Sequence, residues 1–128
     1  MKYYETDELL NGRQWLLNSG IQNVDKSQPE YGSINAWFDP ELNKYSFAYS
    51  EITGYGITTF IFLNKIFSGT KLIERAKIAA EWLQNNSVHD RIKGYRCRFD
   101  LEKKEFNPAN VCSFDNAMCL NGLINLYK

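Results

Sequence analysis

The sequence lacks a charge imbalance, a long apolar run and an apolar leader. Its 128 residues carry 15 basic and 15 acidic side chains, so no long-range field favours nucleic acid or an anionic membrane as a partner. The first eight residues are polar and acidic, unlike a secretory signal. Residues 57–67 form the most apolar stretch, but Asn64 and Lys65 interrupt it, and it is shorter than the roughly 20 residues of a membrane span. We therefore expect a cytoplasmic protein.

Cysteine and histidine are scarce and widely spaced. Cys97, Cys112 and Cys119 are odd in number and contain no C-x-x-C pair, which argues against a disulfide framework and a structural zinc site. His89 is the only histidine, and its polar neighbours are typical of an exposed loop. We expect reduced, buried thiols, no metal and no cofactor.

What the chain does contain is enough apolar material for one helical domain. Hydrophobic residues make up 44% and aromatic residues 15% of the sequence, which excludes disorder and allows one core. Thr6 is placed to cap a first helix, and Gly69 with Thr70 separates the second helix from the third. Apolar residues at helical spacing predict four helices, over about 7–19, 51–67, 71–85 and 114–128.

Two segments rich in aromatic and turn residues, 32–45 and 94–106, predict β-hairpins between these helices. Phe38-Asp39 of the first segment aligns with Phe99-Asp100 of the second, about sixty residues on. This spacing predicts a helix–hairpin–helix unit used twice, over about 7–67 and 70–128. The expected fold is mainly α, a partial α/α toroid of about four helices with β-hairpin connections. The whole chain, 1–128, would form one such domain or a fragment of a longer toroid.

Three segments resemble, in the same order, motifs of the six-hairpin glycosidase-like α/α toroid superfamily. Residues 49–60 resemble its P-E-V-T-G-Y-I-I-P-T-L signature, with Ser50 and Thr58 in place of the prolines. Residues 79–83 resemble A-A-D-W-L, and residues 114–127 resemble F-D-T-G-Q-V-L-x-G-L-x-x-L-Y, with Ala-Met replacing Gly-Gln. The superfamily includes glycoside hydrolases, polysaccharide lyases and sugar epimerases. The resemblance implies a pocket for sugars at the rim of the toroid without fixing the reaction.

Glycoside cleavage needs two carboxyl groups that face a bound sugar. Glu51 and Asp115 are the candidate catalytic pair, because each lies in the first turn of a predicted inner helix and such turns would border the same mouth. The alternative role is structural, since acidic side chains in a first turn also stabilise the helix dipole. Asp39 and Asp100 follow a phenylalanine at a hairpin bend, where turn formation explains them best.

The candidate substrate-binding residues combine aromatic faces on which a pyranose can stack with polar groups for its hydroxyls. Arg96 shares one predicted strand face with Arg98, and both could hold a carboxylated sugar by bidentate hydrogen bonds. Core packing of the aromatics and solvation of the arginines are the alternatives. The candidates are Trp37, Tyr49, Thr53, Tyr55, Tyr95, Arg96 and Asn116.

The sequence thus predicts a carbohydrate-active protein, resembling a glycoside hydrolase, lyase or epimerase, that acts on or binds an oligo- or polysaccharide. If it is an enzyme, it is glycosidase-like or polysaccharide-modifying. The alternative is a non-catalytic structural or interaction module that completes its fold with another segment, by self-association or within a longer parent chain. That alternative predicts an exposed apolar edge on the first or last helix. Polyprenyl binding, a third function, would need a deep apolar pocket.

Overall fold

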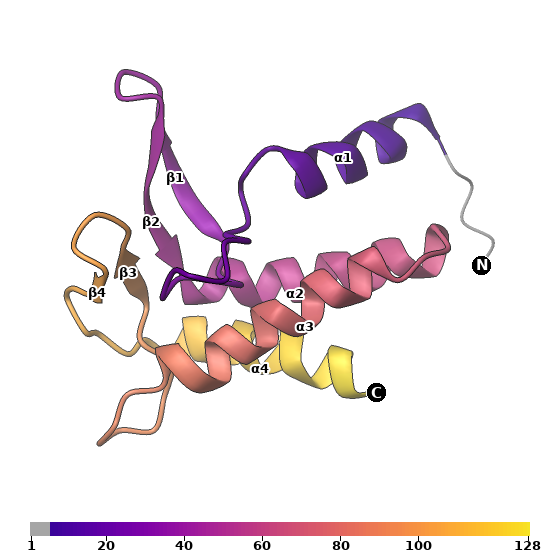
Figure 1. Ribbon diagram of the computed structural model, residues 1–128. Helices are drawn as coiled ribbons and strands as arrows, with labels where there is room; N and C mark the ends of the chain where they lie inside the picture. The colour runs from indigo at the N-terminus through magenta and orange to yellow at the C-terminus, as the bar shows by residue number, and fades with distance from the viewer. Residues whose placement is uncertain (1–5) are drawn as a thin grey trace.

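The computed structural model describes residues 6–128, so residues 1–5 of the predicted domain lie outside the described part (Figure 1). Helices and strands alternate in blocks along the chain. In order, they are α1 (Asp7–Asn18), β1 (Asn35–Asp39), β2 (Lys44–Tyr49), α2 (Ser50–Ile66), α3 (Lys71–Trp82), the π-helical turn η1 (Leu83–Ser87), β3 (Arg98–Asp100), β4 (Glu105–Phe106) and α4 (Ser113–Tyr127).

The predicted fold class is wrong, because the two hairpins join into one sheet. β1 pairs with β2 and β3 with β4, and β2 also pairs with β3 through Ala48–Phe99 and Tyr49–Arg98, giving an antiparallel sheet in the order β1-β2-β3-β4. Pairing β2 with β3 satisfies backbone groups that two separate hairpins would leave unpaired at their edges. Residues 6–128 therefore form a mixed structure of four α-helices and a four-stranded sheet, and not an α/α toroid with hairpin connections.

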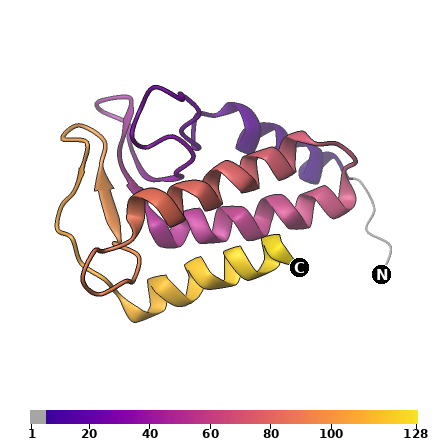
Figure 2. The same cartoon turned by 60° about the horizontal axis from the view of Figure 1, so that its bottom comes forward.

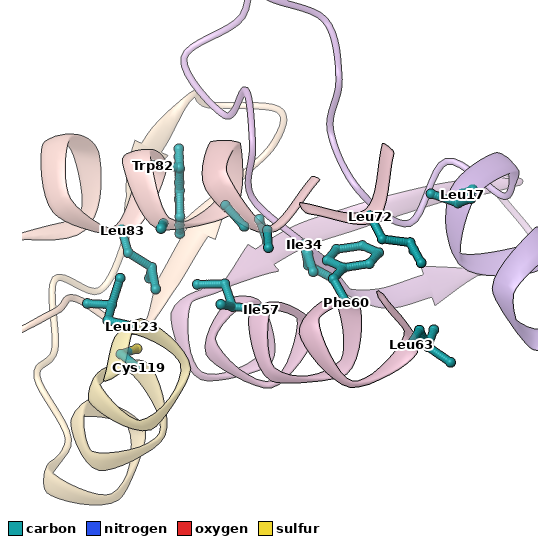
Figure 3. Packing of buried hydrophobic residues seen from close by; sticks show 14 of the residues in the cluster. Leu17, Ile34, Ile57, Phe60, Leu63, Leu72, Trp82, Leu83, Cys119 and Leu123 are labelled. Atoms are coloured by element: carbon teal, nitrogen blue, oxygen red, sulfur yellow. The ribbon is translucent and has the colours of Figure 1, made fainter. Parts of the chain in front are cut away.

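The helices form layers beside the sheet, with α2 between α3 and α4 (Figure 2). α2 is largely apolar and buries residues on the sides that face both neighbours, including Ile57 and Phe60. Ile57 points toward Leu83 and Leu123 in the core, while Phe60 lies near Leu72 (Figure 3). This packing brings the first turns of α2 and α4 to the same end of the molecule, next to the sheet.

Trp82 connects the helices to the sheet. Its ring is 1% exposed, lies edge-on to Phe99 at 6.2 Å and stacks on Phe106 at 5.7 Å. Buried aromatic pairs of this kind stabilise a core beyond the area they bury. Trp82 therefore holds β3 and β4 against α3.

Several local predictions can be compared with the structure. Thr6 caps α1, as predicted, by accepting a hydrogen bond from the Leu9 N–H. Asp39 and Asp100 also have the predicted turn role, since each accepts hydrogen bonds from the backbone N–H groups two and three residues on. Ser50 is the first residue of α2, and its hydroxyl donates to the Arg96 carbonyl at 2.5 Å.

Candidate functional site

The first turn of α2 lies against the segment that leads into β3. The Ser50 N–H donates to the Cys97 carbonyl at 2.9 Å, and the Ser50 hydroxyl donates to the neighbouring Arg96 carbonyl. From the other side, the buried Cys119 thiol of α4 donates to the Ser50 carbonyl at 3.2 Å. Ser50 thus fixes the position of Cys97 relative to both helices.

Asn116, in the first turn of α4, also holds the segment before Cys97 in place. Its side-chain oxygen accepts the Tyr95 N–H at 2.7 Å, and its amide donates to the Tyr95 carbonyl at 3.1 Å and to the Cys112 carbonyl at 2.9 Å. One amide therefore binds both Tyr95, two residues before Cys97, and Cys112, the residue just before α4. This arrangement brings Cys97 and Cys112 close together, although a hairpin and a loop separate them in the sequence.

A groove of about 300 Å³ lies in front of the two cysteines. Arg98 lines this groove, and its guanidinium carbon lies 4.0 Å from the centre of the Phe47 ring. The Tyr49 ring stands edge-on to Phe47 at 6.1 Å. Such stacking orients the guanidinium and desolvates one of its faces. The groove is lined by Phe47, Tyr49, Cys97, Arg98, Pro108, Asn110 and Cys112.

Two other hollows, of about 380 and 400 Å³, contain neither a cysteine nor a candidate catalytic carboxylate. Lys44, Glu74 and Glu102 in these hollows are exposed, and Arg98 lines the first hollow as well as the groove. The groove beside the helix ends is smaller, but it adjoins the buried Cys97 and Asp115. We therefore take it as the candidate site.

Asp115 is the buried charge at the base of this site. It is 6% exposed, and its Oδ2 atom is buried without a hydrogen-bond partner among residues 6–128. Burial, together with the nearby Asp115 carboxylate, raises the pKa of the Tyr49 phenol above its usual range and raises the pKa of Glu51. Burial and the same carboxylate also raise the pKa of the Cys97 thiol to about 12. Asp115 therefore lies close to Tyr49, Cys97 and Glu51, and its carboxyl group disfavours a further negative charge on each of them.

Cys97, Cys112 and Asp115 form a cluster that the sequence analysis did not find. Their two sulfur atoms and one carboxylate oxygen all lie within 4.8 Å of one another. Cys97 and Asp115 are buried, whereas Cys112 is exposed. Distance along the chain concealed the cluster, because β3, β4 and the following loop lie between the cysteines. The order of a cysteine, a hairpin and a cysteine beginning a helix is the one signal the sequence offers.

The structure brings together three of the residues predicted from the sequence. Glu51 and Asp115 lie in the first turns of two adjacent helices, close enough for the charge of one to raise the pKa of the other, and Tyr49 lines the groove beside them. Thr53 is fully buried instead, with its hydroxyl donating to the Tyr49 carbonyl and accepting the Ile34 N–H. Asn116 is likewise occupied by backbone groups.

The other predicted binding residues lie outside the groove lining. Trp37 and Tyr55 are exposed, and Tyr95 is partly buried against the core. Arg96 stacks on Phe106 at 4.2 Å, and its side chain donates to two backbone carbonyls, including that of Asn86 at 2.6 Å. Arg98, which the sequence paired with Arg96, is the arginine that reaches the groove.

No family model matches the chain, and no curated protein and no solved structure is significantly similar to it. The resemblance to glycosidase-like proteins therefore stays a prediction from short motifs. Among residues 6–128, no helix combines the length and the apolar character needed to cross a bilayer.

Proposed function

We propose that the groove binds a carboxylated sugar, alone or as part of an oligosaccharide, and that the protein is carbohydrate-active. The observation that carries this proposal is the Arg98 guanidinium, stacked on Phe47 beside the ring of Tyr49. Within residues 6–128, Arg98 forms no ion pair, and its buried Nε atom has no hydrogen-bond partner. A guanidinium oriented by stacking suits a carboxylate, which accepts two parallel hydrogen bonds from it.

The remainder of the groove suits a sugar ring. Tyr49 and Phe47 offer aromatic faces for the C–H side of a pyranose, while Asn110 offers a polar group for its hydroxyls. The volume of about 300 Å³ is at the lower end of small-molecule sites, which favours one or two sugar units.

Binding has more support than catalysis. Neither Glu51 nor Asp115 lines the groove. Asp115 lies next to the Cys97 and Cys112 thiols, which do line it, and Glu51 lies in the first turn of α2. If the protein turns over its ligand, Glu51 is the carboxyl group that remains partly exposed at the helix end and can exchange a proton with a substrate. A Glu51→Gln variant would then bind the sugar and lose turnover.

Titration of the protein with glucuronic acid and with glucose, followed by NMR chemical shifts, tests this proposal. We expect the acid to bind more tightly than the neutral sugar and to shift the signals of Phe47 and Tyr49. Arg98→Gln should remove this preference, because the amide cannot replace a bidentate cation, and Arg98→Lys should retain part of it. Arg91→Gln, at an exposed loop position, is the matched control. Equal binding of both sugars, or no effect of Arg98→Gln, would refute the proposal.

A second candidate function is self-association through α4. Phe114, Leu120, Ile124 and Tyr127 are each at least half exposed, and α4 holds one charged residue, Asp115, which is buried. An exposed apolar edge on the last helix is what the interaction-module alternative predicted. The occupant we propose is a second copy of this chain, because the net charge is zero and the stripe carries no like charges to repel its equivalent. A solution mass that rises with concentration would support it, and a constant single-chain mass would contradict it.

A further inference from the structure

We propose that Cys97, Cys112 and Asp115 form a binding site for a divalent metal ion of borderline softness, with Zn²⁺ as the best fit. The site supplies two sulfur ligands and one carboxylate oxygen from two segments held together by backbone hydrogen bonds. This inference does not rest on the proposed sugar binding. It concerns the atoms behind the groove, whereas the sugar proposal concerns Arg98 and the aromatic rings in front.

The distances suit a small tetrahedral ion. Zn²⁺ binds sulfur at about 2.3 Å and carboxylate oxygen at about 2.0–2.2 Å, which places two tetrahedral sulfur ligands roughly 3.7 Å apart. The three ligand atoms already lie within 4.8 Å of one another. Closure therefore needs a shift of about 1 Å, within the reach of a side-chain rotation. Cys112 can make this shift, because it is exposed and its thiol makes no cap hydrogen bond to α4.

Asp115 provides the independent sign of a missing ligand. Its side chain is more than nine-tenths buried, yet the buried Oδ2 atom has no hydrogen-bond partner among the described residues. A buried carboxyl oxygen without a hydrogen-bond partner destabilises the folded state. An acid that only capped the helix would spend its oxygens on free N–H groups of the first turn. A metal ion between the thiols would satisfy the Oδ2 atom instead.

The backbone around the cluster is already ordered. The Cys97 N–H donates to the Asn110 carbonyl at 2.9 Å, and the Cys97 carbonyl accepts the Ser50 N–H at the same distance. Asn116 binds the Cys112 carbonyl through both its backbone N–H and its side-chain amide. Binding would therefore cost little further ordering of the chain, as in a site with a satisfied outer shell.

The donor set selects the ion. Thiolates favour Zn²⁺ and other soft or borderline metals over Ca²⁺ and Mg²⁺, while the carboxylate makes the site harder than the all-sulfur sites of Cu(I). Two thiolates, one carboxylate and Zn²⁺ sum to one negative charge, and Arg98 in the same groove offsets it. Because Cys97 and Cys112 both line the groove, the fourth coordination position opens toward it. With Asp115 as a ligand, Glu51 is the carboxyl group left for proton transfer.

Cobalt titration of the full chain under anaerobic, reducing conditions tests the site. We expect one equivalent of Co²⁺ to give a thiolate-to-cobalt absorption band in the near ultraviolet with the visible bands of tetrahedral Co²⁺, and Zn²⁺ to displace it. Cys97→Ser, Cys112→Ser and Asp115→Asn should each weaken binding by at least about tenfold. Cys119→Ser is the control for the loss of a buried thiol, because Cys119 lies in α4 outside the cluster and a serine hydroxyl can still donate to the Ser50 carbonyl.

Each outcome decides the proposal. The absence of a thiolate band, or equal weakening by Cys119→Ser, would overturn it. A Cys97–Cys112 disulfide that forms in air, with no metal binding after reduction, would also overturn it and would identify a redox pair. If substitution of the buried Cys97 prevents folding, the Cys112→Ser variant still tests the site, because Cys112 is exposed. Glucuronate binding measured with a chelator present separates the two proposals, since loss of the metal site leaves Arg98 in place.

Discussion

Gly54 of α2 and Gly122 of α4 face each other where the two helix backbones touch. A Cβ atom on Gly122 would lie 2.5 Å from the Gly54 carbonyl oxygen, and a Cβ atom on Gly54 would lie 2.6 Å from the Met118 carbonyl oxygen. Real side-chain atoms do not approach backbone this closely, so only glycine fits at either position. Gly54 lies about one turn from Glu51 and Gly122 about two turns from Asp115, so this contact sets the distance between the helices that carry the two carboxyl groups.

We expect Gly122→Ala and Gly54→Ala to destabilise the protein. Forcing a methyl group between packed backbones costs roughly 1–3 kcal/mol, which should exceed the gain of about 1 kcal/mol from replacing glycine within a helix. Gly12→Ala in α1 is the matched control, because nothing lies within 4 Å of its Cβ position, so only the gain remains. Urea unfolding measures all three variants. Equal stability of Gly122→Ala and Gly12→Ala would show that the helices separate freely.

The sequence predicted local features well and long-range pairing poorly. The Thr6 cap and the turn roles of Asp39 and Asp100 depend on residues within three positions, and the structure confirms them. The Tyr49–Arg98 pairing that merges the hairpins depends on the packing of whole helices between them. Hairpin patterns show which residues form strands, but not which edges meet, and the predicted fold class was wrong for this reason.

For the candidate site, too, local patterns predicted single residues, and helix packing decided which of them meet. A first-turn position placed Glu51 and Asp115 at helix ends, and the packing of α2 on α4 then brought these ends together. Alternation along a strand suggested that Arg96 and Arg98 would share a face. In the structure they stack on different rings, Phe106 and Phe47, because the chain around Arg96 is drawn toward the η1 turn by its bonds to Asn86 and Ser87.

Lys104 and Glu30 form an ion pair between the β3–β4 turn and the loop before β1. Glu30 is 5% exposed, so we expect Lys104→Met to leave a buried carboxylate without its cation and to cost about 2 kcal/mol of unfolding free energy. Adding Glu30→Gln should recover part of this loss. Lys93→Met is the control, since Lys93 is an exposed lysine whose φ of 62° is close to the 57° of Lys104. Additive effects in the double variant would show that the pair is not coupled.

Asp100 should make stability depend on acid pH. Its Oδ1 atom accepts hydrogen bonds from the N–H groups of Lys103 and Glu102, both at 2.9 Å, and these bonds, that of Lys103 first, lower the pKa of Asp100 in the folded state. A lowered folded-state pKa stabilises the protein above the unfolded pKa of about 3.9, and this contribution is lost as the pH falls through the folded value.

We therefore expect Asp100→Ala to cost about 1 kcal/mol at neutral pH and progressively less below about pH 4. Urea unfolding of both proteins at several pH values measures the difference. Glu105→Ala removes a carboxylate from the same hairpin, and no hydrogen bond is shown for that carboxylate within residues 6–128, so it controls for the change in charge. A cost for Asp100→Ala that stays constant down to strongly acid pH would contradict the assignment.

The exposed stripe of α4 should govern the solution mass. Leu120, Ile124 and Tyr127 recur at a spacing of four and three residues, which is the pattern of a seam between two helices. Ile124→Lys places a charge in the middle of this stripe. We expect the mass of the unmodified chain to rise with concentration in light scattering, and the mass of the Ile124→Lys variant to stay that of a single chain. Its fold should be unaffected, because Ile124 is 53% exposed. Leu42→Lys, at an exposed apolar position in the β1–β2 turn, should leave association unchanged, and a loss of association there too would point to unspecific adhesion.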